Sequence, residues 1–209
     1  MKSSPRSFAL ARIFLLICAG LCSSATFAQT FRITVDTSSL AGATGYVDFQ
    51  FNPADLLAPE ANAAILGWSG SISLFGAPTI EGGVIGALPD TISLSNSTAF
   101  NDYFQAVEFG ENFSFTVQFN GAFAVEPSLL GTSFALALYA SDATSPLLSN
   151  DVSGSLVRFE LAASGVTFDA FSSAAQVAPV PLPAAAWLLL SGLTGLIGVS
   201  RSRRQSTAG

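Results

Sequence analysis

Apolar and polar residues alternate with a period of two through the middle of the chain. The alternation is clearest over 112–120 (NFSFTVQFN), where the apolar residues would face one side and the polar residues the other. This pattern is typical of a β-strand with one buried and one exposed face, so we predict that Phe115 is buried and Thr116 is not. The other predicted strands are 31–36, 46–52, 63–68, 71–75, 91–95, 103–109, 133–140, 157–161 and 166–171.

Short strands of this kind, separated by Gly, Pro, Asn, Asp and Ser, predict an all-β domain over 29–171. Strands with one apolar face must bury it against a second layer, which favours an antiparallel two-sheet sandwich of jelly-roll or immunoglobulin-like type. Asn52-Pro53 is the one helix signal in this region, and it predicts one or two helical turns. Residues 172–181 are small, uncharged and proline-bearing, and we predict an extended linker there.

The first 28 residues have a different composition. Three basic residues precede nine apolar residues and a run of small ones. This is the layout of a secretory signal peptide, and nine apolar residues are too few to span a bilayer. We predict that signal peptidase cuts between Ala28 and Gln29, with a cut after Ala25 as the alternative. Both cysteines, Cys18 and Cys22, would then be removed.

A second apolar segment lies near the C-terminus. Residues 184–199 carry no charge, and Arg201, Arg203 and Arg204 follow them. At about 1.5 Å per residue, a helix of this length spans about 24 Å, slightly less than the bilayer core of about 30 Å. Clustered arginines stay on the cytoplasmic side. We therefore predict a transmembrane helix over 184–199 with an internal basic tail, 201–204, and an external domain.

The residues at the start of this segment form a motif. In order, they are Val180, Pro181, Leu182, Pro183, Ala184 and Trp187. The order of motif, apolar helix and basic end resembles the PEP-CTERM sorting domain of Gram-negative bacteria over residues 180–204, with Leu182 where that family has Glu. The resemblance implies cleavage near 181–183 by an exosortase, a membrane-embedded cysteine enzyme. It also implies an inner-membrane intermediate, followed by release to the cell surface or an extracellular matrix, often with exopolysaccharide and biofilm.

The charges are unevenly distributed. All 14 acidic residues lie in the middle region, where Arg32 and Arg158 are the only basic ones, which gives that region a net charge of −12. Nucleic acid would be repelled, so we expect no nucleic-acid partner. Solubility is the simplest role of these acids. Calcium is the alternative, with Asp102 and Asp151 as weak candidate ligands in predicted loops, although such residues usually stabilise turns. We expect no other cofactor.

The residue types present leave little catalytic chemistry. The chain has no histidine, and its cysteines and single lysine lie in the predicted signal peptide, which removes the Ser-His-Asp triad, the thiol nucleophile and the usual zinc sites. A carboxylate pair of the glycosidase type remains possible. Glu108 would be a candidate acid if its face of strand 103–109 were buried, but a solvent-exposed strand end is the favoured interpretation.

Three functions are therefore open. The first is a non-enzymatic exported surface or matrix protein. The second is a polysaccharide-binding module, with or without calcium, and an exposed aromatic strip on one sheet would favour it. The third is a glycan-cleaving enzyme, which a concave site with two close, differently buried carboxylates would favour. The candidate sugar-stacking aromatics are Trp68, Tyr46, Tyr103 and Tyr139, although core or strand-end positions are more usual for such residues.

Overall fold

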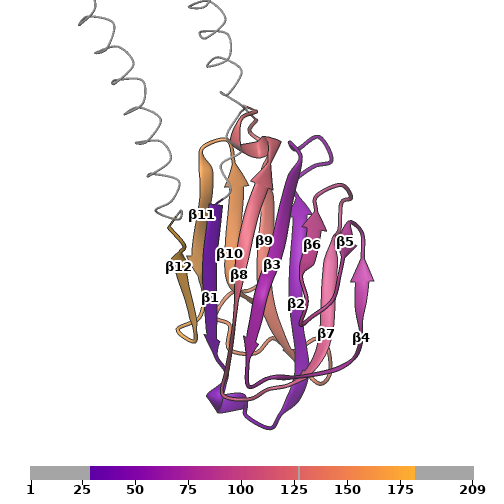
Figure 1. Cartoon of the computed structure of the whole chain (residues 1–209), viewed down its shortest axis with the longest axis vertical. Helices are drawn as coiled ribbons and strands as arrows, with labels where there is room; N and C mark the ends of the chain where they lie inside the picture. Colours follow the sequence, from indigo (N-terminus) through magenta and orange to yellow (C-terminus); the bar gives the residue numbers. More distant parts are fainter. Residues whose placement is uncertain (1–28, 127, 182–209) are drawn as a thin grey trace, which may run out of the picture.

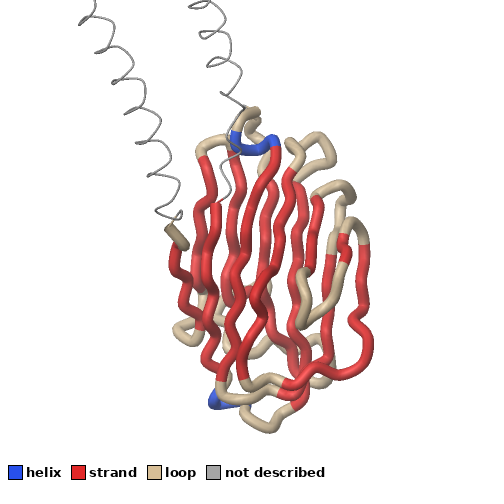
Figure 2. Tube along the Cα trace, viewed as in Figure 1, coloured by secondary structure: helices blue, strands red, loops and turns tan. Residues whose placement is uncertain are grey.

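The computed structural model describes residues 29–126 and 128–181, and within them the chain is an antiparallel β-sandwich (Figure 1). Besides the strands, the described residues contain two short 3₁₀ helices, η1 (Ser38–Leu40) and η2 (Ala122–Ala124) (Figure 2). The strands are β1 (Gln29–Asp36), β2 (Thr44–Pro53), β3 (Ala61–Gly70), β4 (Ser73–Glu81), β5 (Val84–Ile85), β6 (Ile92–Ser95), β7 (Asp102–Glu108), β8 (Asn112–Gly121), β9 (Thr132–Ala140), β10 (Ser155–Ala162), β11 (Gly165–Ala170) and β12 (Ala175–Pro179).

The strands form two sheets of six within the described residues. The first sheet has the order β12-β1-β8-β3-β6-β5, and the second has the order β11-β10-β9-β2-β7-β4. Part of the pairing is nested, because β1 pairs with β8, β2 with β7 and β3 with β6. The prediction of an all-β, two-sheet antiparallel sandwich is therefore confirmed.

The core between the sheets is rich in phenylalanine. Phe49 of β2 contacts Phe115 of β8 with ring centroids 5.2 Å apart, and Phe119 contacts Phe159 of β10 at the same distance. All four rings are fully buried. Along β8 the apolar residues at alternate positions are all buried, whereas Thr116 is half-buried on the outer face. The strand and its register are as the alternation predicted.

Residues 175–179, within the predicted linker, instead form strand β12. They pair with residues 31–35 of β1, so that Val35 lies opposite Ala175 and Phe31 lies opposite Pro179. Ala175 is buried and Val177 is half-buried, so this strand has an inward face, but a very small one. Small side chains and a proline concealed that face in the sequence, because neither gives a clear apolar alternation.

The helical turn predicted at Asn52-Pro53 is wrong. Both residues complete β2, where Pro53 lies opposite Thr132 of β9. The Asn52 side chain does not cap a helix, because its Oδ1 accepts a hydrogen bond of 2.8 Å from the backbone N–H of Asn101. The segment that follows is a turn, in which Asp55 Oδ1 accepts from the backbone N–H of Leu57 at 2.8 Å. A long-range contact thus replaces the local cap that the dipeptide suggests.

One further strand prediction differs in extent, and one short strand was not predicted. The stretch predicted at 71–75 continues to Glu81 as β4, with an irregularity in pairing between Phe75 and Thr79 that interrupts the alternation. Gly76 lies within it at φ +59°, a conformation that glycine adopts without strain. The two-residue strand β5 was not predicted, since so short a segment has no readable period.

Both ends of the described chain leave the sandwich at the same end. The backbone N–H of Val180 donates to the carbonyl of Thr30 at 2.8 Å, and η1 lies at the opposite end of the molecule (Figure 1). The predicted signal peptide, and the sorting signal from Leu182 onward with its helix and basic tail, lie outside the described residues. Among the residues that are described, no helix has the length and apolarity needed to cross a membrane.

Candidate functional site

The outer face of the second sheet is hollowed along its two central strands. Because Val47 and Phe49 of β2 point into the core, Asp48 and Gln50 point outward. On the adjacent strand β9, the outward positions include the small residues Ala135 and Ala137. These side chains leave a hollow of about 140 Å³, which we call the groove. Its lining residues are Asp48, Gln50, Asn52, Ser133, Ala135, Ala137, Tyr139, Ser153, Ser155 and Arg158.

One wall of the groove is held by an ion pair. Arg158 of β10 contacts Asp151, which lies in the loop after β9, with 2.7 Å between Nη2 and Oδ2. The Arg158 guanidinium also lies over the ring of Phe171, 5.1 Å from its centroid. The pKa of Asp151 is lowered mainly by a hydrogen bond from Ser153, and the nearby Arg158 lowers it further. Asp151, a predicted calcium ligand, is therefore already neutralised by a guanidinium.

Asp48, one of the residues that line the groove, belongs to a buried carboxyl pair. Asp48 is only 2 % exposed, and its Oδ2 accepts a hydrogen bond of 2.8 Å from Gln50 Nε2. The side chain of Asp102 on β7 lies within hydrogen-bonding reach of Asp48. The Oδ1 atoms of both residues are buried and have no hydrogen-bond partner among the described residues. One proton held between the two carboxyl groups would satisfy both oxygens, and it would remove the repulsion of two buried negative charges.

The environment of this pair favours that proton. The pKa of Asp48 is raised to about 9, mainly by burial and also by the neighbouring Asp102. The pKa of Asp102 is also raised, again chiefly by burial. Burial raises the pKa of the Tyr139 hydroxyl beside them, and the two aspartates add to that effect. At neutral pH the protonated form of Asp48 is therefore favoured.

Asp102, the other predicted calcium ligand, is the first residue of a strand and not part of a loop. It lies beside Asp48, and neither Asp102 nor Asp151 is among the residues that line the groove. Among the residues that the structure describes, no three acidic, histidine or cysteine side chains are grouped so as to hold a metal ion. Asn101, the residue before Asp102, is fully buried, and its Nδ2 donates to the carbonyl of Phe51 at 2.8 Å.

The position of Asp48 in the site is not evident from the sequence. In the strand YVDFQFN it occupies an outward position, which the alternation assigns to solvent. Its burial arises from neighbours that are distant in sequence, because Phe104 of β7 and Ala137 of β9 lie directly opposite it. An acidic residue flanked by apolar and aromatic residues in a central strand is the only signal of its position. That signal is weak, because most such residues are exposed.

An aromatic cluster borders the groove at one end. The rings of Tyr46 and Phe104 are stacked with centroids 4.4 Å apart, and Tyr139 lies 6.0 Å from Phe104. We call these three residues the aromatic ridge. Beyond the ridge is a second hollow of about 90 Å³, whose lining includes Phe75 and Ser141. The outer face thus presents a groove, a ridge and a second hollow in succession along β2 and β9.

The other two candidate aromatics belong to the interior. Tyr103 is fully buried, where its hydroxyl accepts from the backbone N–H of Leu88 at 2.9 Å and donates to Gln105 Oε1 at 3.1 Å. Trp68 is half-buried and stacks on Phe113 at a centroid distance of 4.9 Å. Glu108 is exposed at the end of β7, as the favoured interpretation of the sequence held. None of these three residues contributes to the groove.

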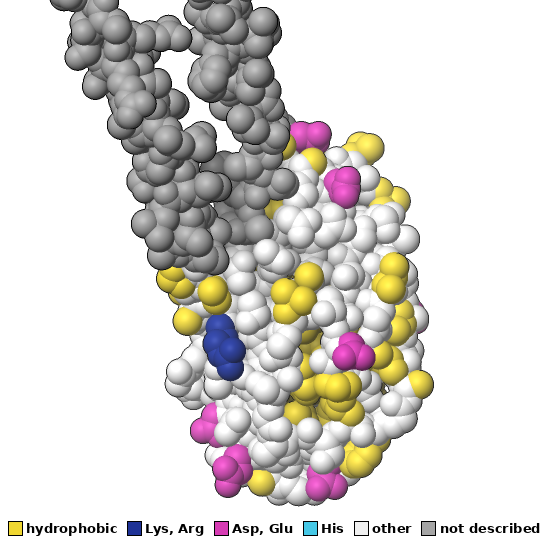
Figure 3. Space-filling model, in the orientation of Figure 1, with side chains coloured by type: hydrophobic (Ala, Val, Ile, Leu, Met, Phe, Trp, Pro, Cys, Tyr) yellow, Lys and Arg dark blue, Asp and Glu magenta, His cyan; other side chains and the backbone are white. Residues whose placement is uncertain are grey.

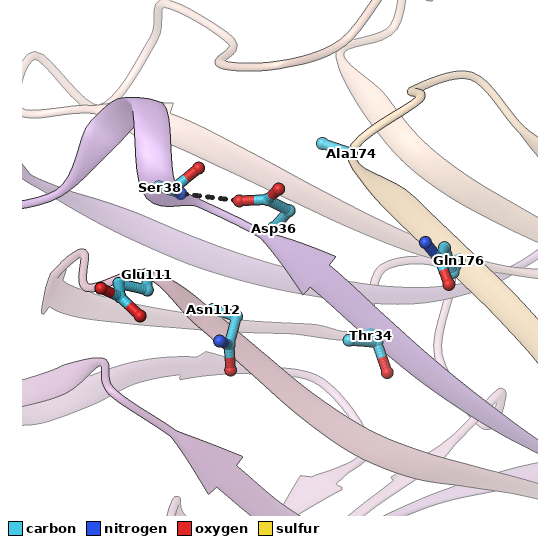
Figure 4. Close-up of a pocket in the computed structure, with 7 residues that line it drawn as sticks. All are labelled: Thr34, Asp36, Ser38, Glu111, Asn112, Ala174 and Gln176. Carbon is cyan, nitrogen blue, oxygen red and sulfur yellow. Dashed lines mark hydrogen bonds between the residues drawn. The ribbon is translucent and has the colours of Figure 1, made fainter.

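A larger hollow, of about 380 Å³, lies near η1 and contains no buried polar side chain (Figure 4). Its lining residues are Thr34, Asp36, Ser38, Glu111, Asn112, Ala174 and Gln176. Asp36 accepts a hydrogen bond of 2.9 Å from the backbone N–H of Ser38, and hydrogen bonds with Ser38 lower its pKa. The labelled side chains spread around the hollow and do not converge on one point. The groove on the second sheet is therefore the better candidate site.

Comparisons of the chain with family models, with curated proteins and with solved structures found no match.

Proposed function

We propose that this chain is a non-enzymatic exported protein of the cell surface or extracellular matrix, released when an exosortase cuts its C-terminal sorting signal. The extent of the strand pairing supports this proposal most directly. Gln29, the first residue after the proposed signal-peptidase cut, pairs with Phe119 of β8. Strand β12 ends at Pro179, immediately before the motif. Both cuts would leave every described strand intact.

The position of the two ends also supports the proposal. The backbone N–H of Val180 is hydrogen-bonded to the carbonyl of Thr30, so the two ends of the described chain lie at one end of the sandwich. A membrane-held intermediate would then place the whole domain on one side of the bilayer, with the end that carries η1 farthest from it (Figure 1). On the face drawn in Figure 3, most of the surface is neither charged nor hydrophobic, and hydrophobic patches and isolated acidic side chains are scattered over it.

We propose further that the sandwich is of the jelly-roll type and not immunoglobulin-like. The nested pairing of β1 with β8, β2 with β7 and β3 with β6 supports this, because a jelly roll is a long antiparallel hairpin wrapped into two sheets. The additional strands β9 to β12 extend both sheets at one side.

The carboxyl pair argues against glycan cleavage. Asp48 and Asp102 are close and unequally buried, which is the feature expected of a glycan-cleaving enzyme. Glycosidases, however, hold their two carboxyl groups about 5 to 10 Å apart so that the sugar and a water can enter between them. A hydrogen-bonded pair leaves no such space. The groove instead favours the second function, a polysaccharide-binding module.

The proposal is tested in the producing organism by following the C-terminal tail. In surface material from the wild type, mass spectrometry should find the chain without residues 184–204. In a strain that lacks the exosortase, the tail should persist in the membrane fraction. Pro181→Ala with Pro183→Ala should also retain the tail, whereas Pro179→Ala, at the end of β12, is the matched control and should be cut normally. Equal retention of the tail with and without the enzyme would contradict the proposal and indicate a permanent anchor.

A further inference from the structure

We propose that the groove on the second sheet binds a neutral sugar unit of an extracellular polysaccharide, and that the polymer continues along β2 and β9 across the aromatic ridge. The inference rests on the proposed function only in supposing that the domain meets such a polymer outside the cell. The site itself consists of residues that the structure brings together on one face.

The lining of the groove has the mixed chemistry that a sugar ring requires. Ala135 and Ala137 provide a small apolar floor on which the C–H face of a ring can lie, and Tyr139 provides an aromatic wall. Hydroxyl and amide groups surround this floor, among them Gln50, Asn52, Ser133 and Ser155. Gln50 uses its amide nitrogen for Asp48, so that its carbonyl oxygen is available to accept from a ligand hydroxyl.

The charges of the groove favour a neutral ligand. The one guanidinium in the lining, Arg158, is paired with Asp151 at 2.7 Å and is further held over Phe171. Asp48 retains its proton at neutral pH because its burial raises the pKa of that carboxyl. A uronate or sulfate group would therefore find no unpaired cation, and it would meet the repulsion of a domain whose net charge is −12, from 14 acidic and two basic residues.

The length of the site fits a polymer better than a single sugar. The outward residues of β2 run from Asn52 in the groove, past Tyr46 in the ridge, to Thr44 in the second hollow. At about 3.4 Å per residue this track measures about 27 Å. Each contact along it is shallow, so affinity would come from several sugar units bound together.

Binding is measured on the full chain in detergent, so that the result does not depend on sorting. The probes are hexasaccharides of neutral glucan, mannan and galactan, with a polygalacturonate hexasaccharide as the anionic arm. At least one neutral probe should bind more tightly than the polyuronate by calorimetry. Ala135→Leu fills the groove and should weaken that binding about tenfold or more. Ala64→Leu, a half-buried outward position on β3 of the first sheet, is the matched control and should leave binding unchanged.

The melting temperatures of both variants verify that they fold. Equal binding by Ala135→Leu and wild type, tighter binding of the polyuronate, or no binding of any neutral probe would overturn this inference. None of these outcomes affects the tail-cleavage experiment. Conversely, a retained tail with intact neutral-sugar binding would overturn the proposed sorting and support the groove.

Discussion

The outer faces of the two sheets differ, although both sheets present the same kind of inner face. On the first sheet, Thr116 and Gln118 point into solvent, and Arg32 donates a hydrogen bond of 2.8 Å to Ser114. On the second sheet, the equivalent positions bury Asp48 and carry the half-buried aromatic ridge beside a floor of small residues. The alternation that builds the sandwich therefore does not determine the chemistry of the outward positions, and the groove beside the buried carboxyl group lies on the second sheet.

The inner faces should be energetically equivalent, and this gives the largest expected effect. Phe115→Ala in the first sheet and Phe49→Ala in the second should each lower the free energy of unfolding by about 3–5 kcal/mol, because each leaves a cavity in a fully buried core. Thr116→Ala, on the outer face, should change it by less than about 0.5 kcal/mol. Urea denaturation measures all three. A larger loss for Thr116→Ala than for Phe115→Ala would refute the register of β8.

The buried carboxyl pair should give the second sheet a distinctive dependence on pH. The pKa of Asp48 is raised to about 9 in the folded protein, so between about pH 4 and pH 9 the folded chain binds more protons than the unfolded one. Stability should therefore fall as pH rises through this window. Asp48→Asn supplies a permanent donor to Asp102 and should reduce this slope, so that the variant is at least as stable as the wild type at pH 8.5.

The matched control is Asp142→Asn in the loop after β9. Hydrogen bonds from Ser145 and Thr144 lower the pKa of Asp142 to about 2, so its contribution has the opposite sign and is lost only as pH falls below about 4. This substitution should leave the slope between pH 5 and pH 8.5 as in the wild type. A wild-type stability that rises over that range would contradict the shared proton.

The two arginines of the domain lie one on each outer face, and their substitution should give the smallest difference in stability. Arg158→Gln removes the ion pair with Asp151 and the contact with Phe171, and we expect a decrease of about 2 °C in the melting temperature. Arg32→Gln removes a single hydrogen bond to Ser114 and should have a smaller effect. Calorimetry compares the two variants. A larger decrease in melting temperature for Arg32→Gln than for Arg158→Gln would contradict a stabilising role of Arg158 in the groove wall.

The sequence predicted the inward half of the molecule well and the outward half poorly, for a physical reason. A strand that buries one apolar face has apolar residues at every second position, and this pattern can be recognised within a single strand. The buried inward positions of β8 match it. The partners of Asp48 come from β7 and β9, whose residues approach it only after the sheet has formed. For the same reason the local sequence predicts a helix cap at Asn52, although the partner of its side chain is Asn101 on a distant segment.

The central claim is that the second sheet, and not the first, carries the binding face. It is tested most directly by adding the neutral hexasaccharide that binds best to the full chain and mapping the change in backbone amide NMR signals. We predict that the signals of Ala135, Tyr139 and Gln50 shift on titration, while those of Thr116 and Gln118 stay in place. Shifts confined to the first sheet, or saturating binding that leaves the signals of the groove unchanged, would contradict the account.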